Sequence, residues 1–302
     1  MKNKFLKKTR NFLIIVLIYF LKGIFYFIPM RAVEALGEKF GVLFSFFMNK
    51  DKEIILKNLD IVYGKSRFSD QEKKEFVKKN FKNYGRGLFE FIKISVSPPE
   101  KIASMIKEVY GLEYFHKAKK EGKSLLGVTA HFSNWELLPI YMKFLGFNVG
   151  VIGKKLFDDR IDRIVRSART RIGVKAYDRD VVSRDMIREM KEGGLVLGIL
   201  VDQDTRVDSI TMPFLGVPAK TPIGPAVLAK HYGSYVCTLF VVRRQDGYYD
   251  LIINKPYDIN KEDSIEKIVK LYNDDISNMI LKYPEQWAWI HDRFKSTIKK
   301  VT

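Results

Sequence analysis

The hydrophobic pattern divides the chain into an apolar N-terminal run, a region of helical periodicity and a region of alternating strand-like and helical segments. The apolar run covers residues 12–28. From there to about residue 120, apolar residues recur at helical spacing, which predicts helices over 31–48, 51–63 and 69–95. The last of these follows Ser69, where the sequence Ser-Asp-Gln-Glu fits a capping box.

The pattern changes after residue 124. Short apolar runs predict strands at Leu125–Ala130, Phe147–Ile152, Leu195–Val201, Val236–Val242 and Tyr248–Ile253. Helical stretches separate or follow them, at 134–145, 159–172, 182–191 and 221–232, the last with Thr221 as N-cap and Pro222 at its first position. The turn Gln245–Gly247 predicts that the last two strands form an antiparallel hairpin at one edge of the sheet.

Strands that alternate with helices are typical of a mainly parallel sheet covered by helices on both faces. We therefore expect an α/β fold with an N-terminal membrane-anchoring helix and a helical extension. Apolar residues make up 46% of the chain and aromatic residues 13%, which is ample for a core. With no internal repeat or linker, the sequence suggests an anchor at residues 1–30 and one α/β domain at residues 31–302.

The first thirty residues favour a membrane. Residues 1–10 carry five positive charges and no acid. The following run, residues 12–28, has 17 residues and contains Lys22, so it lies at the short limit for a bilayer span. No small-x-small cleavage site of a secretory signal precedes Pro29. We interpret the segment as an anchor lying in one leaflet that leaves the body cytoplasmic, with a full span as the alternative.

Charge and rare residue types narrow the classes of function. Lys and Arg number 53 against 35 Asp and Glu, and the net charge of +18 predicts an anionic partner. Helix-turn-helix, zinc-finger and RNA-binding signatures are absent, so we expect anionic membrane lipids or an acidic protein and no nucleic acid. One cysteine and four histidines argue against a disulfide framework, a cysteine-based zinc site and a multi-histidine metal centre.

The sharpest local signal is the segment Thr129–Glu136, with the sequence TAHFSNWE. His131 stands at the carboxyl end of a predicted buried strand, where open α/β sheets bind their ligands. Glu136 falls in the first turn of the next predicted helix, so the turn could bring an imidazole base and a carboxylate together. Since no serine or cysteine nucleophile is evident, such a base would activate a hydroxyl of the substrate.

A structural interpretation of the same segment stays open at this point. His131 could be an ordinary strand-end histidine whose ring only satisfies a hydrogen bond. Ser133–Glu136 also fits a capping box, in which the Glu136 carboxylate would accept the Ser133 N–H.

Basic residues form a second constellation. The predicted helix 159–172 carries five arginines, including Arg169, opposite an apolar face. Arginine forks suit phosphate groups, although the solvated face of an amphipathic helix is an equal interpretation. Lys154 and Lys155 follow the second predicted strand, at the same sheet edge as His131, and are better candidates for an acceptor pocket.

Acidic residues follow the third predicted strand. The Asp202-Gln203-Asp204 triplet could bind a divalent metal and a sugar nucleotide, which gives a glycosyltransferase alternative. Hard-metal sites need more oxygen ligands than these two carboxylates supply. We rather expect one aspartate to cooperate with His131 or to bind the acceptor's polar head, while the other holds the loop.

Four motifs in order carry a resemblance to a known family. They are HFSNWE (131–136), VDQD (201–204), MPFLGVPAKTPIGPAVLAKHYG (212–233) and PEQWAWIHDRFK (284–295). Together they resemble the late acyltransferases of lipid A biosynthesis, the lauroyl and myristoyl transferases, within the H-x4-D/E glycerolipid acyltransferase superfamily. The likeness covers roughly residues 5–296. It implies metal-free and cofactor-free catalysis at the cytoplasmic face of the bacterial inner membrane.

The resemblance also implies roles for individual residues. His131 is then the catalytic base and Glu136 its partner, and a fatty acyl group moves from acyl carrier protein, or from acyl-CoA, to a hydroxyl of a lipid A precursor. We expect the acyl acceptor to be bound by Phe132, Ser133, Asn134, Lys154, Lys155, Arg169, Asp202, Gln203 and Asp204. Where the family usually has Tyr-Arg-Pro, this chain has Gly-Lys-Lys at 153–155, a departure that concerns acceptor recognition.

Other functions remain as alternatives. The enzyme could acylate another phosphoglycolipid, or the chain could be a non-enzymatic binder of anionic membranes. The binder hypothesis explains the anchor and the charge but gives HFSNWE and VDQD no role. Trp287, Trp289, Phe294 and Cys237 lie in apolar surroundings and are expected to pack in the core or at an interface.

Overall fold

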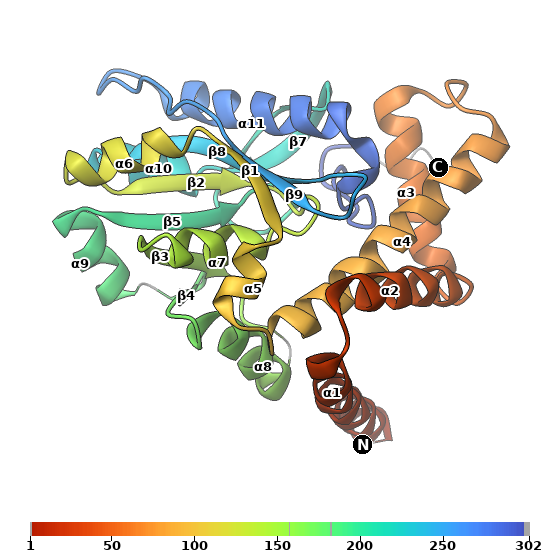
Figure 1. Ribbon diagram of the computed structural model, residues 1–302. Helices are drawn as coiled ribbons and strands as arrows, with labels where there is room; N and C mark the ends of the chain where they lie inside the picture. Colours follow the sequence, from red (N-terminus) through yellow and green to blue (C-terminus); the bar gives the residue numbers. More distant parts are fainter. Residues whose placement is uncertain (1, 157, 182, 299–302) are drawn as a thin grey trace.

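A mostly parallel sheet forms the centre of the protein (Figure 1). The computed structural model describes residues 2–156, 158–181 and 183–298. In this part of the chain the sheet has seven strands in the order β1-β9-β8-β2-β5-β3-β4, and every neighbouring pair is parallel except β8–β9. The strands are β1 (Ile106–Tyr110), β2 (Leu125–Thr129), β3 (Asn148–Gly153), β4 (Lys175–Asp178), β5 (Leu195–Leu200), β8 (Tyr235–Arg243) and β9 (Tyr249–Ile253). The predicted α/β fold is confirmed.

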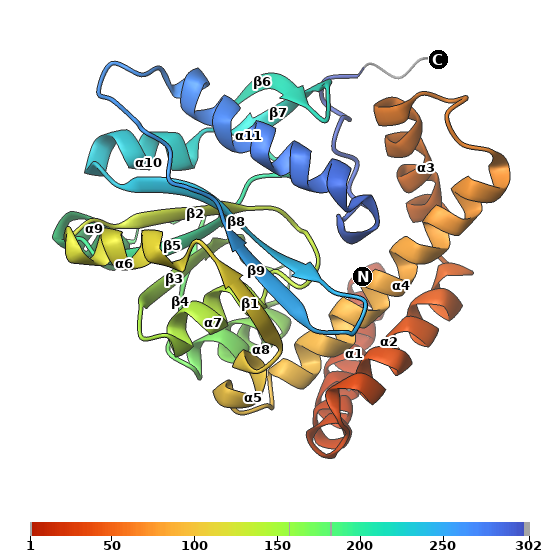
Figure 2. The same ribbon diagram turned by 45° about the horizontal axis from the view of Figure 1, so that its top comes forward.

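Helices cover both faces of the sheet (Figures 1 and 2). One face packs against α9 (Arg184–Glu192), α10 (Gly224–Tyr232) and α11 (Ile265–Lys282), and the other against α5 (Pro99–Ala103), α6 (Leu112–Lys120) and α7 (Leu137–Phe144). Helix α8 (Asp159–Thr170) contacts β4. Because side chains alternate along a strand, Leu195 and Leu197 join the first core while Val196 joins the second. Two cores separated by the sheet therefore stabilise the fold.

Four helices precede the sheet, namely α1 (Lys2–Phe27), α2 (Met30–Ser45), α3 (Asn49–Tyr63) and α4 (Asp70–Ile94). Ser69 and Glu72 form the predicted capping box at the start of α4. Helices α2 and α4 cross at very short range, since a Cβ added at Gly41 or at Gly85 would collide with the backbone of the other helix. Glycine at these positions lets the two helices pack as one unit.

Helix α1 extends away from the sheet (Figure 1). Its segment Lys8–Phe27 has 20 residues with a mean hydropathy of 1.7, long and apolar enough to cross a membrane. Large apolar side chains on it are exposed, including Phe12, Leu17 and Phe20, whereas Phe25 is buried against Phe89 of α4. This helix fits the predicted membrane anchor.

The structure corrects several predicted elements. The short strands β1 and β4 were not predicted, because their sequences are half polar and carry no clear strand signal. The β8–β9 hairpin is confirmed, but it does not lie at the sheet edge, since β1 pairs with β9 on its outer side.

Two predicted helix starts are also wrong. Strands β6 (Ser209–Phe214) and β7 (Val217–Pro222) form a separate hairpin, so Thr221 lies in a strand and α10 begins only at Gly224. Thr221 is held there by side-chain hydrogen bonds with Asn273 and Arg293. Helix α7 begins at Leu137, three residues later than predicted from residue 134, because the preceding loop is held by distant parts of the chain.

Candidate active site

His131 lies just beyond the carboxyl end of β2, next to the segment that follows β5. Thr129 and Leu200 are paired in the parallel sheet, so His131 and Asp202 stand side by side two residues further on. The His131 backbone N–H donates to Asp202 Oδ2 at 2.9 Å, and His131 Nδ1 lies 2.8 Å from Asp202 Oδ1. Trp287 Nε1 donates to the same Oδ2 at 2.8 Å. Asp202 is thus the carboxylate that orients the histidine ring.

Asp202 keeps its negative charge although its side chain is only 1% exposed. Burial by itself raises the pKa of Asp202, but His131 and the hydrogen bonds from His131 and Trp287 hold that pKa at about 2. A carboxylate ionised in this way accepts the proton of Nδ1. The other ring nitrogen, Nε2, then carries the lone pair that a general base needs.

The surroundings of the His131 ring leave Nε2 at a cavity. The ring meets Trp135 edge to face, with centroids 4.9 Å apart, and Gln203 Nε2 lies 3.4 Å from His131 Nε2. His131, Trp135 and Gln203 all line the same cavity. The imidazole is therefore held in place by packing and by Asp202, while its reactive edge stays accessible.

Glu136 has a different partner from the one predicted. Its carboxylate forms a two-pronged ion pair with Arg169 of α8, with Oε2–Nε at 2.9 Å and Oε1–Nη2 at 2.5 Å. Burial lowers the pKa of Arg169, but the Glu136 carboxylate outweighs that effect and the pKa is raised. The capping-box interpretation is wrong, because the Ser133 N–H donates to the carbonyl of Gln286 and not to Glu136. Both members of the pair line the cavity beside His131.

The loop that carries His131 and Glu136 is fixed by the C-terminal segment. Ser133 has a φ of +52°, a left-handed conformation that is uncommon for a residue other than glycine. Its N–H donates to the carbonyl of Gln286 at 2.6 Å, and the N–H of Ala288 donates to the carbonyl of His131 at 3.0 Å. The PEQWA part of the fourth motif therefore holds the loop in a conformation that the local sequence alone would not favour.

A buried ionic cluster holds the loop from the other side. Asn134 Nδ2 donates to Glu90 Oε2 of α4 at 2.9 Å, and Glu90 also accepts from Tyr249 and Arg243, each at 2.7 Å. Glu90 is 0% exposed. Glu34 of α2 joins the cluster, and burial, reinforced by the nearby Glu90 charge, raises its pKa to about 7. The helical extension thus reaches the loop that carries His131 through hydrogen bonds.

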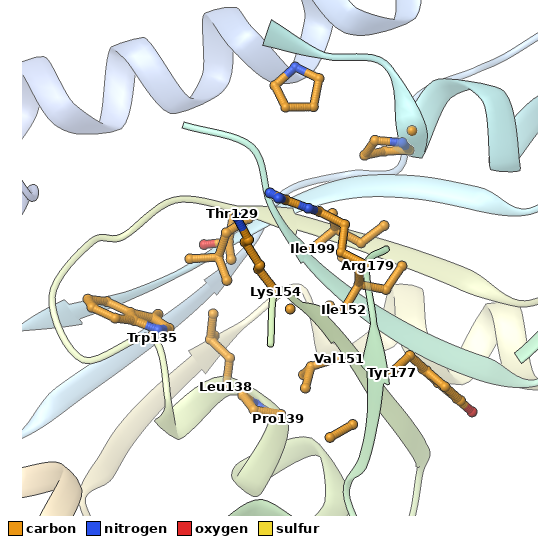
Figure 3. A pocket seen from close by; sticks show the side chains of 18 of the residues that line it. Thr129, Trp135, Leu138, Pro139, Val151, Ile152, Lys154, Tyr177, Arg179 and Ile199 are labelled. Atoms are coloured by element: carbon orange, nitrogen blue, oxygen red, sulfur yellow. The ribbon is translucent and has the colours of Figure 1, made fainter. Parts of the chain in front are cut away.

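The cavity beside His131 has a volume of about 710 Å³. It lies between α7 and the sheet, and Figure 3 shows part of its lining. Its inner wall is apolar and includes Leu138, Met142, Val149, Val151, Val196 and Leu239. Gly127 and Gly198 are paired on β2 and β5 at the cavity floor, where the Leu239 side chain occupies the space beside Gly127 and Val151 lies beside Gly198. The space suits a long apolar chain.

The predicted acceptor-binding residues divide into two groups. Lys154, Arg169 and Gln203 line the cavity, whereas Phe132, Ser133, Asn134, Lys155, Asp202 and Asp204 do not belong to its lining. Phe132 is buried against Phe240, and Lys155 pairs with Asp159 at 2.9 Å. Asp204 accepts from the N–H of Ser296, so the two aspartates of the DQD triplet hold different segments.

The arginine face of α8 binds the protein itself. Arg160 pairs with Asp158, Arg166 with Asp162 and Arg169 with Glu136, while Arg171 donates to the carbonyls of Ile94 and Ser97. Because these four arginines are already bonded within the protein, they are not free to bind a phosphate group as predicted. Arg179, which follows β4, lines the cavity and was missed, because the sequence of β4 gave no strand to place it.

Comparisons with known proteins identify the family of this chain. Residues 1–296 match the family model described as bacterial lipid A biosynthesis acyltransferase. The chain is similar to the lipid A biosynthesis lauroyltransferase of Escherichia coli K12, at 28% identity over 89% of this chain and 87% of that protein. It is also similar to the palmitoleoyltransferase of the same organism at 25% identity, with 89% and 87% covered. The resemblance of the four motifs is confirmed: the chain belongs to the bacterial lipid A biosynthesis acyltransferase family and is an acyltransferase.

Proposed function

We propose that this protein transfers a fatty acyl chain from a thioester donor to a hydroxyl of a lipid A precursor, with His131 as the general base. The observation that carries the proposal is the pairing of His131 with the buried carboxylate of Asp202, at an apolar cavity of about 710 Å³. The family supports lipid A acylation in general. The donor, the base and the cellular location are our inference.

The proposed reaction follows from the protonation state of the His131 imidazole, with the proton on Nδ1 and the lone pair on Nε2. His131 Nε2 takes the proton of the acceptor hydroxyl as its oxygen attacks the thioester carbonyl, and Asp202 stabilises the imidazolium that forms. When the tetrahedral intermediate collapses, the carbon–sulfur bond breaks and the thiol sulfur leaves with the proton from His131. The Gln203 amide, close to Nε2, is placed to donate to the carbonyl oxygen while it carries negative charge.

Glu136 keeps a role at the cavity that is distinct from orienting His131. Arg169 holds the Glu136 carboxylate in a fixed position next to the base. We infer that this carboxylate contacts the acceptor beside the reacting hydroxyl. The bidentate ion pair makes that contact rigid, which is what positioning a substrate requires.

The apolar part of the cavity is our candidate for the acyl chain of the donor. Long hydrocarbon chains gain free energy when they leave water for a wall of apolar side chains. The net charge of +18 suits an acidic carrier such as acyl carrier protein. It also favours anionic membrane lipids around the enzyme.

Helix α1 is our candidate for the attachment to the inner membrane. Its exposed apolar side chains have no protein partner that would cover most of them, as only 11% of its most apolar stretch is buried. With the anchor in the bilayer, the catalytic domain would face the cytoplasm, where acyl carrier protein is present.

A reconstituted assay with the full-length protein tests the proposal. We expect wild-type protein to add one acyl chain to a lipid A precursor from acyl carrier protein thioester, seen by mass spectrometry. His131→Ala should lower the rate by about 10²–10⁴-fold, since this is the usual contribution of a general base. Near wild-type turnover of the variant would remove His131 from the mechanism. Loss of a secondary acyl chain from cellular lipid A without the gene would identify the acceptor.

A further inference from the structure

Two cations stand side by side at the end of neighbouring strands. Gly153 of β3 pairs with Asp178 of β4, and the N–H of Arg179 donates to the carbonyl of Gly153 at 2.9 Å. Lys154 and Arg179 are the next residues on each strand, and both side chains line the cavity. Figure 3 shows them on the opposite side of the cavity from Leu138 and Pro139. The parallel pairing therefore brings two positive charges to one rim.

In the described part of the cavity wall, Lys154 and Arg179 have no acidic partner, whereas Arg166 and Arg169 do. Glu136 is paired with Arg169, and Asp162 with Arg166. Arg179 meets only the exposed Asp180, at 3.3 Å, in the described part of the chain. A third acid of the lining, Asp208, is exposed to solvent. Adjacent cations repel each other, so a rim with this arrangement gains free energy when an anion binds.

The position of the pair relative to His131 fits a substrate that spans both. Strands β2, β5, β3 and β4 follow one another in the sheet, at a spacing of about 4.8 Å. Lys154 therefore lies about 10 Å, and Arg179 about 14 Å, along the sheet edge from His131. An acceptor whose hydroxyl reaches Nε2 of His131 would place a polar head group at this rim.

We propose that Lys154 and Arg179 form a binding subsite for a phosphate group of the acyl acceptor. The guanidinium fork of Arg179 and the ammonium of Lys154 offer charge-assisted hydrogen bonds to phosphate oxygens. Two positive charges also match the charge of a phosphate monoester, about −1.5 to −2 at neutral pH. The proposal rests on the proposed function, and it assigns a role to Lys154 and to Arg179.

Steady-state kinetics with matched acceptors test the subsite. The full chain is compared with Lys154→Met and Arg179→Leu, using a phosphorylated acceptor and the same acceptor after phosphatase treatment. We expect each variant to raise KM for the phosphorylated acceptor about tenfold with little change in kcat, because a charge-assisted hydrogen bond is lost. For the dephosphorylated acceptor, variants and wild type should have equal KM. Lys191→Met and Arg188→Leu, on the exposed side of α9, are the controls and should behave as wild type.

Three results would overturn the subsite. These are an unchanged KM in both variants, an equal loss with both acceptors, and a rise in KM for the thioester donor alone, which would assign the anion to the donor. If wild type transfers no acyl chain at all, the proposed function fails, and phosphorus NMR still tests the subsite. Line broadening of inorganic phosphate by wild type, but not by the double variant, would support it, and equal broadening would reject it.

Discussion

Asp202 decides which nitrogen of His131 is free to act. Its buried carboxylate accepts from the His131 backbone, the imidazole and the Trp287 indole at once. Three donors on one carboxylate explain why burial does not protonate it, and they also fix its position. The Asp202 side chain thereby connects His131 with Trp287 of the C-terminal motif.

Asp202→Asn is expected to lower the rate of acyl transfer by at least about 10²-fold while leaving acceptor KM nearly unchanged. The amide keeps the shape of the side chain but not the charge that stabilises the imidazolium. The Asp202 carboxylate should also make the stability of the wild type depend on pH. Because the folded-state pKa of Asp202 is about 2, below its ordinary value of 3.8, this group stabilises the fold above about pH 4 and the effect is lost as the pH falls toward 2.

Thermal unfolding of both proteins between pH 2 and 6 checks this second effect. The difference in Tm between wild type and Asp202→Asn should shrink toward the acid end. A difference in Tm that stays constant, together with an unchanged rate, would show that Asp202 only packs against Trp287.

Gly198 sets the free space on the cavity floor. A Cβ at this position would lie 3.4 Å from Val151, which is ordinary contact, so a small side chain fits without displacing the backbone. We expect Gly198→Val to narrow the cavity and to shift the donor preference toward shorter acyl chains. Competition between thioesters of different chain length, read by mass spectrometry, measures the shift. An unchanged product distribution would mean that the acyl chain lies elsewhere.

Helices α2 and α4 are connected to the loop that carries His131 through a buried cluster of charged side chains. Glu90 of α4 holds Asn134, and Arg243 at the end of β8 binds Glu90 and lies 3.6 Å from Glu34 of α2. Burial and then the neighbouring Glu90 charge disfavour a charged Glu34, and the positive charges of Arg243 and Arg86 only partly offset them. The pKa of Glu34 is therefore raised to about 7.

Glu34→Gln should therefore stabilise the protein at high pH and leave it nearly unchanged at low pH. The pKa of Glu34 is raised in the fold from 4.5 to about 7, so ionising it costs stability progressively as the pH rises between these values. Thermal denaturation at pH 5 and pH 8 checks the sign. A variant that is less stable than wild type at pH 8 would show that the Glu34 charge is needed by Arg243.

The whole molecule combines a basic surface with one exposed apolar helix. The net charge of +18 and the uncovered side of α1 both favour an anionic membrane. The end of α1 is nonetheless part of the fold, because Phe25 packs on Phe89 and Lys93 donates to the carbonyl of Phe25. The exposed apolar part of α1 and the part that packs in the core are thus different parts of the same helix.

Deletion of residues 2–20 should release the protein from membranes while its cooperative unfolding is retained, since the deletion spares Phe25. The basic surface should still bind vesicles containing phosphatidylglycerol at low salt and lose them at high salt. Sedimentation with such vesicles checks the binding, and calorimetry checks the unfolding. Salt-resistant binding of the truncated protein would place the main membrane contact outside α1.

Some elements could be predicted from local sequence pattern alone. Both faces of a parallel sheet are buried, so strands β2, β5 and β8 consist of short runs of apolar residues. Such runs can be recognised without knowing which strands pair with them. The capping box of α4 and the place of His131 at a strand end are local in the same way. Four motifs were enough to predict the family.

Which side chains meet depends on how distant segments of the chain pack together. Asp202 rather than Glu136 contacts the His131 ring because β5 lies next to β2, and strand order depends on long-range pairing that no local pattern encodes. Glu136 finds Arg169 because α8 packs beside α7, and Arg179 reaches the cavity on a strand too short and too polar to predict. Hydrogen bonds and ion pairs between distant segments form only after the two cores have placed those segments side by side.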